Sequence, residues 1–189
     1  MKLTRPIFVA IEGIDGCGKS TFVELLAPAL GCHLLRCPPE ELGEVRKMFD
    51  MNDIAHKLFY ASANMVVSKR VSELLRSGES VICDRYWLST KVYSSVREED
   101  INIDIIEDHL ARPDFTIYLH LDEPVRRKRM VKRGKMNEID LRSMADVDRL
   151  KEGYDVELGK KFSGQVVRAD TGSSTPEELV RQVCAKLRG

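Results

Sequence analysis

A glycine-rich segment near the amino end of the chain carries residue types that bind phosphate. It places a glycine, four variable positions and then glycine, lysine and serine in the run Gly13-Ile14-Asp15-Gly16-Cys17-Gly18-Lys19-Ser20-Thr21. Glycines let backbone N–H groups curl around phosphate oxygens, because no Cβ stands in the way. We expect Lys19 to reach the β- and γ-phosphates of ATP and the Ser20 hydroxyl to bind Mg²⁺. The alternative is a glycine-rich turn that only joins a strand to a helix.

A second group of chemically active residues follows the apolar residues 81–83. Asp84 and Arg85 supply a carboxylate and a guanidinium there, and three hydroxyls follow at Ser89, Thr90 and Tyr93. The planar guanidinium suits bidentate binding of a phosphate. The carboxylate is placed to order the water around Mg²⁺, so Asp84 joins Ser20 as a candidate metal residue. The alternative is a structural Asp–Arg pair at the end of a strand.

A third group is a run of basic residues at 126–135, in which seven of ten positions are lysine or arginine. On a helix, Arg126, Arg129 and Arg133 share one face, since residues three and four apart are neighbours. That face can stabilise the charge on a transferring phosphoryl group when a lid closes. A solvated helix surface and a nucleic-acid patch are the alternatives.

The pattern of apolar segments predicts the elements that position these groups. Continuous apolar runs are typical of parallel strands that are covered on both faces. We expect strands at 7–11, 33–35, 81–83, 115–119 and 165–167. Helices are expected at 19–30, from a cap at Asp53 to a stop at Gly78, and after the cap Thr175. The alternation predicts an α/β fold with a five-stranded parallel sheet flanked by helices, which binds ligands at the carboxyl ends of its strands.

The composition narrows the class of protein. With 30 basic and 30 acidic residues the 189-residue chain has no formal net charge, which argues against nucleic-acid and membrane partners. The five cysteines are odd in number and lack metal-ligand spacing, so we expect a reducing, cytoplasmic compartment. The length favours one domain over residues 1–189 and a small-molecule kinase over a nucleic-acid motor. The Asn-Lys-x-Asp guanine reader of GTPases is missing.

The motifs make the chain similar to the thymidylate kinase family. The resemblance rests on Glu12 and Asp15 in the phosphate loop, Asp84-Arg85-Tyr86 with Ser89 and Tyr93, Pro113-Asp114, Lys128-Arg129 with Arg133-Gly134, and Gly153-Tyr154. It implies a three-layer P-loop kinase fold with a short lid at about 134–143. It also implies a homodimer that uses Mg²⁺ and transfers the γ-phosphoryl of ATP to a deoxynucleoside monophosphate, with dTMP as the first candidate.

The resemblance implies roles for residues near the phosphates. Arg85 would bind the phosphate of the acceptor, and Asp15 would lie near the acceptor's 3′-hydroxyl and the metal; with Lys19 these are the expected catalytic residues. Gly16 leaves the phosphate loop without the catalytic arginine that some members carry there. Arg129 and Arg133 are therefore the candidates to supply it.

Other residues would hold the rest of the acceptor. Phe59 would stack on the base, Tyr93 would press against the sugar, and Arg36 would help to orient the phosphates, with Ser89 and Thr90 nearby. Phe59 on an apolar helix face is alternatively part of the core, and Arg36 is alternatively a solvated strand end.

The chain departs from the family at the base and the lid. Ala63 stands where members usually carry an arginine that reaches a thymine oxygen, and Glu138 replaces a lid arginine. These changes spare the phosphate machinery and predict weaker selection for thymine, with one hydrogen bond supplied by Thr90.

Two other functions are compatible with parts of this pattern. A deoxynucleoside kinase would use Glu12 as the base for an acceptor hydroxyl, but Arg85 and Arg36 would then lack an acceptor phosphate. A non-catalytic nucleotide-binding regulator is disfavoured by the intact set of Asp15, Lys19, Ser20, Asp84 and Arg85.

Overall fold

The computed structural model describes residues 5–96, 101–132, 134 and 143–188. Its strands form one parallel sheet in the order β2-β3-β1-β4-β5. They are β1 Phe8–Glu12, β2 His33–Arg36, β3 Val81–Asp84, β4 Phe115–His120 and β5 Gln165–Asp170. The predicted α/β class and all five predicted strands are confirmed, with carboxyl ends one to three residues further along the chain and with β1 beginning one residue later than expected.

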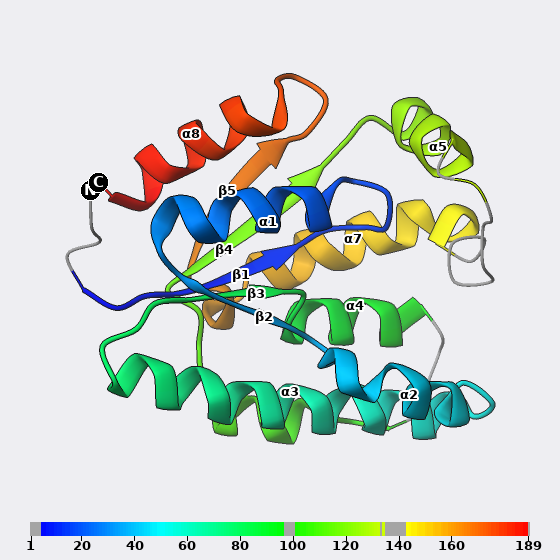
Figure 1. Cartoon of the computed structure of the whole chain (residues 1–189). Helices are drawn as coiled ribbons and strands as arrows, with labels where there is room; N and C mark the ends of the chain where they lie inside the picture. Colours follow the sequence, from blue (N-terminus) through cyan, green and yellow to red (C-terminus); the bar gives the residue numbers. More distant parts are fainter. Residues whose placement is uncertain (1–4, 97–100, 133, 135–142, 189) are drawn as a thin grey trace.

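Helices cover both faces of the sheet, so the molecule has three layers (Figure 1). Lys19–Leu30 (α1) and Pro176–Arg188 (α8) lie on one face, and Asp53–Arg76 (α3), Trp87–Val96 (α4) and Val147–Leu158 (α7) lie on the other. The helices α2 (Gly43–Phe49) and α5 (Glu123–Lys132) lie toward the carboxyl edge of the sheet. Short 3-10 turns are η1 (Glu40–Leu42), η2 (Asp104–His109) and η3 (Lys161–Ser163).

Two apolar cores separate the layers. Successive strand residues point to opposite faces, so Val9 and Ile11 pack beneath α1 and α8 while Phe8 and Ala10 pack beneath α4 and α7. All five residues of β1 are buried. Burial on both faces explains why β1, β3 and β4 appear in the sequence as continuous apolar runs, whereas the edge strands β2 and β5 are only partly buried.

The register of the sheet aligns the strand ends. Asp84 at the end of β3 is paired with both Ile11 of β1 and Arg36 of β2, and Glu12 is paired with Tyr118 of β4. The residues that follow β1, β2 and β3 therefore meet at one edge of the sheet, as the parallel topology requires.

The helix ends follow local capping chemistry. Asn52 caps α3 with its Oδ1, which accepts a hydrogen bond of 2.8 Å from the N–H of Ala55. The cap predicted at Asp53 was thus wrong by one residue. The Thr175 cap of α8 is confirmed: its Oγ1 accepts from the N–H of Glu178 at 3.3 Å, and the Glu178 carboxylate accepts from the N–H of Thr175 at 3.0 Å. In the part of the chain that the structure describes, no helix combines the length and apolarity needed to cross a membrane.

Candidate functional site

The glycine-rich loop connects β1 to α1, which is the context expected of a phosphate-binding loop. Gly13 has φ 143° and packs so closely on the carbonyl of Leu119 that a side chain there would collide with it. Gly18 caps α1 with φ 91°. These positions need glycine because side chains disfavour positive φ. The loop therefore leads directly into the amino end of α1, where the helix dipole favours the binding of an anion.

Lys19 is folded against this loop. Its ammonium donates hydrogen bonds to the carbonyl oxygens of Gly13 at 2.8 Å and Ile14 at 2.9 Å. The Sγ of Cys17 lies 3.8 Å away, which is a long and weak contact. An ammonium has three N–H donors. The third can therefore be donated to a phosphate oxygen without breaking the two bonds that fix the loop.

An ion pair joins the two sequence motifs. The Arg85 guanidinium contacts the Asp15 carboxylate and donates to Ser89 Oγ at 3.2 Å. The Tyr93 hydroxyl donates to the same carboxylate at 2.8 Å, and the guanidinium lies 5.4 Å from the centre of the Tyr93 ring. Burial alone would raise the pKa of Asp15, but the charges of Arg85 and Lys19, with the Tyr93 hydrogen bond, lower that pKa to about 2. The carboxylate is therefore ionised at neutral pH.

The backbone of Arg85 is strained. Among the described residues it is the one non-glycine with positive φ, at 65°. A hydrogen bond of 2.9 Å from its N–H to the carbonyl of Ile11 holds this turn, and the next N–H, of Tyr86, donates to Glu12 Oε1 at 3.0 Å. Such a conformation costs about 1–3 kcal/mol and is concentrated at functional sites. The strain aims the guanidinium of Arg85 across the phosphate loop.

Glu12 anchors this turn from below. Its carboxylate is fully buried and accepts hydrogen bonds from the N–H of Tyr86, from the N–H and hydroxyl of Ser89, and from the Tyr154 hydroxyl at 3.4 Å. Burial raises the pKa of Glu12, although the hydrogen bonds from Ser89 and the charge of Arg85 oppose this. Enclosed by these donors, Glu12 is poorly placed to take a proton from an acceptor hydroxyl. This geometry disfavours the deoxynucleoside kinase alternative.

Tyr154 is a site residue to which the sequence assigned no role. It is fully buried on α7, and its hydroxyl lies 2.9 Å from Ser89 Oγ and 3.4 Å from the carbonyl oxygen of Gly13. Burial raises its pKa well above that of a free tyrosine. The Gly153-Tyr154 pair in the family resemblance was the signal that could have indicated it.

The environment of Asp84 fits the predicted magnesium site, for which Ser20 at the start of α1 is the other candidate residue. Asp84 lies at the end of β3, and its Oδ1 is buried without a hydrogen-bond partner among the described residues. Burying a carboxylate oxygen unpaired is unfavourable, which fits a cation or its bound water nearby. In those same residues no cluster of three or more acidic, cysteine or histidine side chains can hold a metal alone. The set suits Mg²⁺, which keeps waters and phosphate oxygens as ligands.

The basic helix α5 packs against the phosphate loop. Arg126 is only 1% exposed, and its guanidinium donates to the carbonyl oxygen of Asp15 at 2.6 Å. Glu123 accepts from the same guanidinium at 2.7 and 3.0 Å. A Cβ on Gly16 would lie 2.6 Å from Met130, which shows how closely the helix approaches. Arg126 therefore braces the loop, a role that the charge pattern alone did not indicate.

Arg129 lies at the outer end of the loop. Its guanidinium donates to Thr171, at 2.9 Å to the carbonyl oxygen and 3.3 Å to Oγ1, and lies beside Gly18. With Ser174, whose Oγ is buried without a partner in the described chain, these residues line a hollow of about 290 Å³. Arg133 and Glu138 lie outside the described residues, as does most of the predicted lid. The catalytic roles of Arg129 and Arg133 stay predictions.

Two further acceptor candidates lie apart from Arg85, Arg36 at the end of β2 and Phe59 on α3. Arg36 at the end of β2 forms ion pairs with Glu40 and, at 3.6 Å, with Glu24. Phe59 is 8% exposed and packs on Phe49 with ring centres 5.0 Å apart. The structure thus brings Ser89 and Tyr93 directly to Arg85, whereas the described contacts of Arg36 and Phe59 are with other residues.

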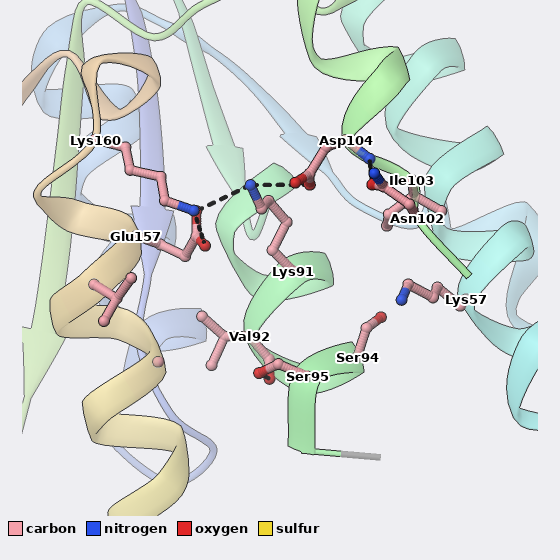
Figure 2. A pocket seen from close by; sticks show the side chains of 12 residues that line it. Lys57, Lys91, Val92, Ser94, Ser95, Asn102, Ile103, Asp104, Glu157 and Lys160 are labelled. Carbon is pink, nitrogen blue, oxygen red and sulfur yellow. Dashed lines mark hydrogen bonds and ion pairs between the residues drawn. The ribbon is translucent and has the colours of Figure 1, made fainter. Parts of the chain in front are cut away.

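A separate hollow of about 400 Å³ lies on the other side of α4 (Figure 2). Figure 2 shows Lys91 between Asp104 and Glu157. Its ammonium is 3.1 Å from Asp104 and 3.3 Å from both Glu107 and Glu157, so its charge is already compensated. We interpret this cluster as a brace between α4, η2 and α7.

Comparison with known proteins gives a consistent result. The family model described as thymidylate kinase matches residues 11–183. The thymidylate kinase of Leptospira borgpetersenii is 28% identical over 96% of this chain and 93% of its own. The probable thymidylate kinase of Pyrococcus horikoshii is 32% identical over 72% and 75%. Among solved structures, thymidylate kinase from Candida albicans has a TM-score of 0.77 at 22% identity, covering 97% of this chain and 91% of that one.

Proposed function

Because the chain belongs to the thymidylate kinase family, an ATP-dependent family of nucleoside monophosphate kinases, we propose that it transfers the γ-phosphoryl of ATP to dTMP through the site between the phosphate loop and α4. The observation that carries this proposal is Arg85. A strained backbone and a fixed ion pair hold its guanidinium beside the loop, where a second phosphate would meet the first.

On the donor side, the phosphate loop and Lys19 bind the phosphates of ATP. The backbone N–H groups and the amino end of α1 face the anion, and the free donor of Lys19 reaches the transferring group. Asp84 and Ser20 would hold Mg²⁺, which supplies charge neutralisation for the β- and γ-phosphates when bound. Arg129 and the hollow beside Gly18 and Thr171 are suited to the nucleoside part of ATP.

On the acceptor side, Arg85 exchanges part of its pairing with Asp15 for the monophosphate. Its planar fork matches two phosphate oxygens. The acceptor oxygen is already ionised near neutral pH, so transfer needs alignment and charge stabilisation and no strong base. Tyr93 lies beside Arg85 and would contact the sugar that is attached to this phosphate.

The test is ADP release from ATP across a panel of nucleosides and their monophosphates. We expect turnover with dTMP and none with thymidine, and we expect Lys19→Ala to abolish it while circular dichroism shows an intact fold. Preference for thymidine over dTMP would establish the deoxynucleoside kinase alternative. A folded wild-type protein that binds ATP without turnover of any acceptor would establish the regulator.

The assembly and location follow as further proposals. We propose a homodimer formed through α3, because Ile54, Leu58 and Met65 on one of its faces are 44%, 44% and 45% exposed. We also propose a cytoplasmic location, which is supported by the five cysteines, all of them free thiols.

A further inference from the structure

The phosphate loop contains a tight turn whose central peptide bond has two possible orientations. The N–H of Cys17 donates to the carbonyl oxygen of Ile14 at 3.4 Å. This bond closes a four-residue turn with Asp15 and Gly16 at its centre. Gly16 has φ 85°, and Asp15 has a negative φ, since Arg85 alone among the described non-glycine residues has a positive one. These angles fit a type II turn, which requires a positive φ at its third residue.

A type I turn differs from a type II turn mainly in how the central peptide is oriented, here the peptide between Asp15 and Gly16. Because a trans peptide is planar, its C=O and N–H point in opposite directions, and rotation of the unit exchanges them. Glycine adopts both the positive φ of the type II turn and the negative φ of the type I turn. The local sequence therefore permits both orientations, and a contact from outside the turn has to select one.

Arg126 of α5 supplies such a contact. Its Nη1 donates to the carbonyl oxygen of Asp15 at 2.6 Å. The Nε and Nη2 of the same guanidinium donate to the two carboxylate oxygens of Glu123 at 2.7 and 3.0 Å, so three bonds fix the plane of the fork. The side chain is buried. Turning the Asp15 carbonyl away would deprive a buried, charged N–H of its acceptor, which is unfavourable.

The opposite end of the same peptide is free to bind a ligand. Among the described residues, the N–H groups of Gly16 and Gly18 have no acceptor. Successive free N–H groups in a glycine-rich loop form a concave site for an anion. As long as the Asp15 carbonyl is held at α5, the N–H of Gly16 points away from α5 and can serve as one of these donors.

We propose that Arg126 is a positioning residue for phosphoryl transfer, which holds the Asp15–Gly16 peptide in one orientation so that the Gly16 N–H donates to the phosphates of ATP. In the other orientation a carbonyl oxygen would face the phosphates and repel them. A preorganised donor stabilises the charge that develops during transfer without having to reorient at that moment. The proposal rests on the proposed function, but the orientation of the peptide can be measured without any acceptor.

This role differs from a direct contact with phosphate. All three nitrogen atoms of the Arg126 guanidinium already have acceptors, in Glu123 and in the carbonyl of Asp15. The guanidinium therefore acts on the substrate through the backbone of the loop. Gly16 makes this possible, since a side chain at that position would collide with Met130 and keep α5 away from the loop.

The experiment measures the orientation of this one peptide by NMR. The dipeptide Asp-Gly occurs once in the sequence, at residues 15–16. Full-length protein with ¹³C in the aspartate carbonyls and ¹⁵N in the glycines therefore gives one amide signal with both labels adjacent. In a type II turn the Gly16 N–H lies beside the Hα of Asp15, whereas in a type I turn it points away. We expect a strong nuclear Overhauser effect between these two protons in the wild type, both without ligand and with ADP and Mg²⁺.

Arg126→Leu should weaken this effect, because both orientations of the peptide become populated. It should also lower kcat about 100-fold, the smaller of the losses that follow removal of one preorganised donor. Arg126→Lys keeps the charge on a shorter side chain and should be intermediate in both measurements. Arg127→Leu is the matched control and should behave as the wild type. Arg127 also donates to Glu123, at 2.8 Å, but its side chain is 51% exposed.

Other glycine signals separate a change at the turn from general loosening of the fold. Gly31 at the end of α1 and Gly78 beyond α3 lie outside the loop, and their amide signals should be the same in Arg126→Leu as in the wild type. If Arg126→Leu does not fold, Arg126→Gln decides the proposal. Its neutral side chain is too short to reach the Asp15 carbonyl but keeps a polar partner for Glu123, and we expect the same weakened effect and lower kcat.

Two results would overturn this inference while leaving the proposed function intact. The first is a nuclear Overhauser effect as strong as that of the wild type in folded Arg126→Leu or Arg126→Gln, which would mean that another group selects the turn. The second is a lost orientation of the peptide with an unchanged kcat, which would mean that the Gly16 N–H takes no part in transfer. Absence of turnover with any monophosphate in the wild type would instead refute the proposed function itself.

Discussion

Arg85 and Asp15 form an ion pair at the position that we propose for the acceptor phosphate. The pair is supported by Ser89 and Tyr93 of α4, and Arg85 has a left-handed backbone. Substitutions at this pair therefore report on the acceptor more than on ATP, which is bound mainly by the loop.

Arg85→Ala should raise the KM for dTMP and lower kcat, with little change in the KM for ATP. The phosphate loses a bidentate, charged partner, and each bond to a charged group contributes about 1.5–3 kcal/mol, so kcat/KM for dTMP should fall on the order of 100-fold or more. Steady-state kinetics with each substrate varied in turn measure both effects. Arg85→Lys keeps the charge without the fork and should be intermediate. If Arg85→Ala strongly weakened ATP binding and left dTMP binding unchanged, Arg85 would belong to the ATP site and not to the acceptor site.

The lowered pKa of Asp15 predicts how the free energy of unfolding depends on pH. Its pKa is about 2 in the folded protein, below its ordinary value of 3.8. Because the ionised Asp15 carboxylate is favoured in the folded protein, it stabilises the fold fully above pH 3.8. This stabilisation is lost as the pH falls toward 2 and the carboxylate becomes protonated. The difference in the free energy of unfolding between wild type and Asp15→Asn should be constant above pH 5 and shrink by roughly 2 kcal/mol in acid.

Urea unfolding at a series of pH values measures this difference. Asp148→Asn removes an exposed carboxylate from α7 and serves as the control, for which a smaller pH dependence is expected. A wild-type advantage over Asp15→Asn that persists unchanged into strong acid would contradict the ion pair described for Arg85.

At the scale of elements, α5 shows what a charge pattern can and cannot predict. The structure places the helix of the basic run against the phosphate loop, but the run itself did not distinguish its arginines from one another. Arg126 is buried because α5 packs on Gly16, and Arg129 is exposed because its side chain extends along the outside of the loop. The packing of α5 on the phosphate loop determines which arginine is buried, and the sequence of α5 alone does not predict it.

Arg129→Ala should lower kcat and also raise the KM for ATP. The predicted catalytic role accounts for the first effect, and the hollow that Arg129 lines with Thr171 accounts for the second. Lys128→Ala removes a neighbouring exposed charge and should change neither value by more than about twofold, since an isolated surface charge contributes little. If Arg129→Ala and Lys128→Ala change kcat and the KM for ATP to the same extent, α5 acts only through its overall charge.

A substitution at Ala63 tests the side of α3 that we propose to face the acceptor base. Ala63 is 2% exposed and packs in the core beneath α3, so an arginine there must displace its neighbours. We expect Ala63→Arg to lower stability by about 1–3 kcal/mol through overpacking, and to lower the KM for dTMP because a charged donor is added. Thermal unfolding and acceptor kinetics measure the two effects. Ser62→Arg adds the same charge on the exposed face and should produce neither.

At the scale of the whole molecule, the architecture could be predicted and several contacts could not. Continuous apolar runs identified the five strands of the described sheet, and burial on both faces accounts for this pattern in β1, β3 and β4. Thr175 identified the start of α8 through its local capping chemistry. Glu12 and Tyr154 meet under α4 from positions 142 residues apart in the chain, and nothing in the neighbourhood of either residue indicates the other. Local signals predict elements, whereas pairs of distant polar residues follow only from the packed fold.

The proposed homodimer makes a prediction at this scale. Replacing Leu58 and Met65 by glutamate should leave a folded monomer, because charges on the exposed face of α3 oppose burial of that face against a second copy. Sedimentation velocity measures the change. Val131→Glu, at a 61% exposed position on α5, is the control and should stay dimeric. A wild type that sediments as a monomer at all concentrations would remove the proposal.

Asp15 touches both halves of the site at once. Its carboxylate is bound to Arg85 on the acceptor side, while its backbone carbonyl is bound by Arg126 of α5, the helix that also carries Arg129. An acceptor that draws Arg85 away from Asp15 alters a residue whose backbone supports the donor side. With the proposed site assignments we expect the affinities for the two substrates to be coupled. Such coupling is reciprocal by thermodynamic necessity: the factor by which one substrate changes the binding of the other is the same in either order of addition.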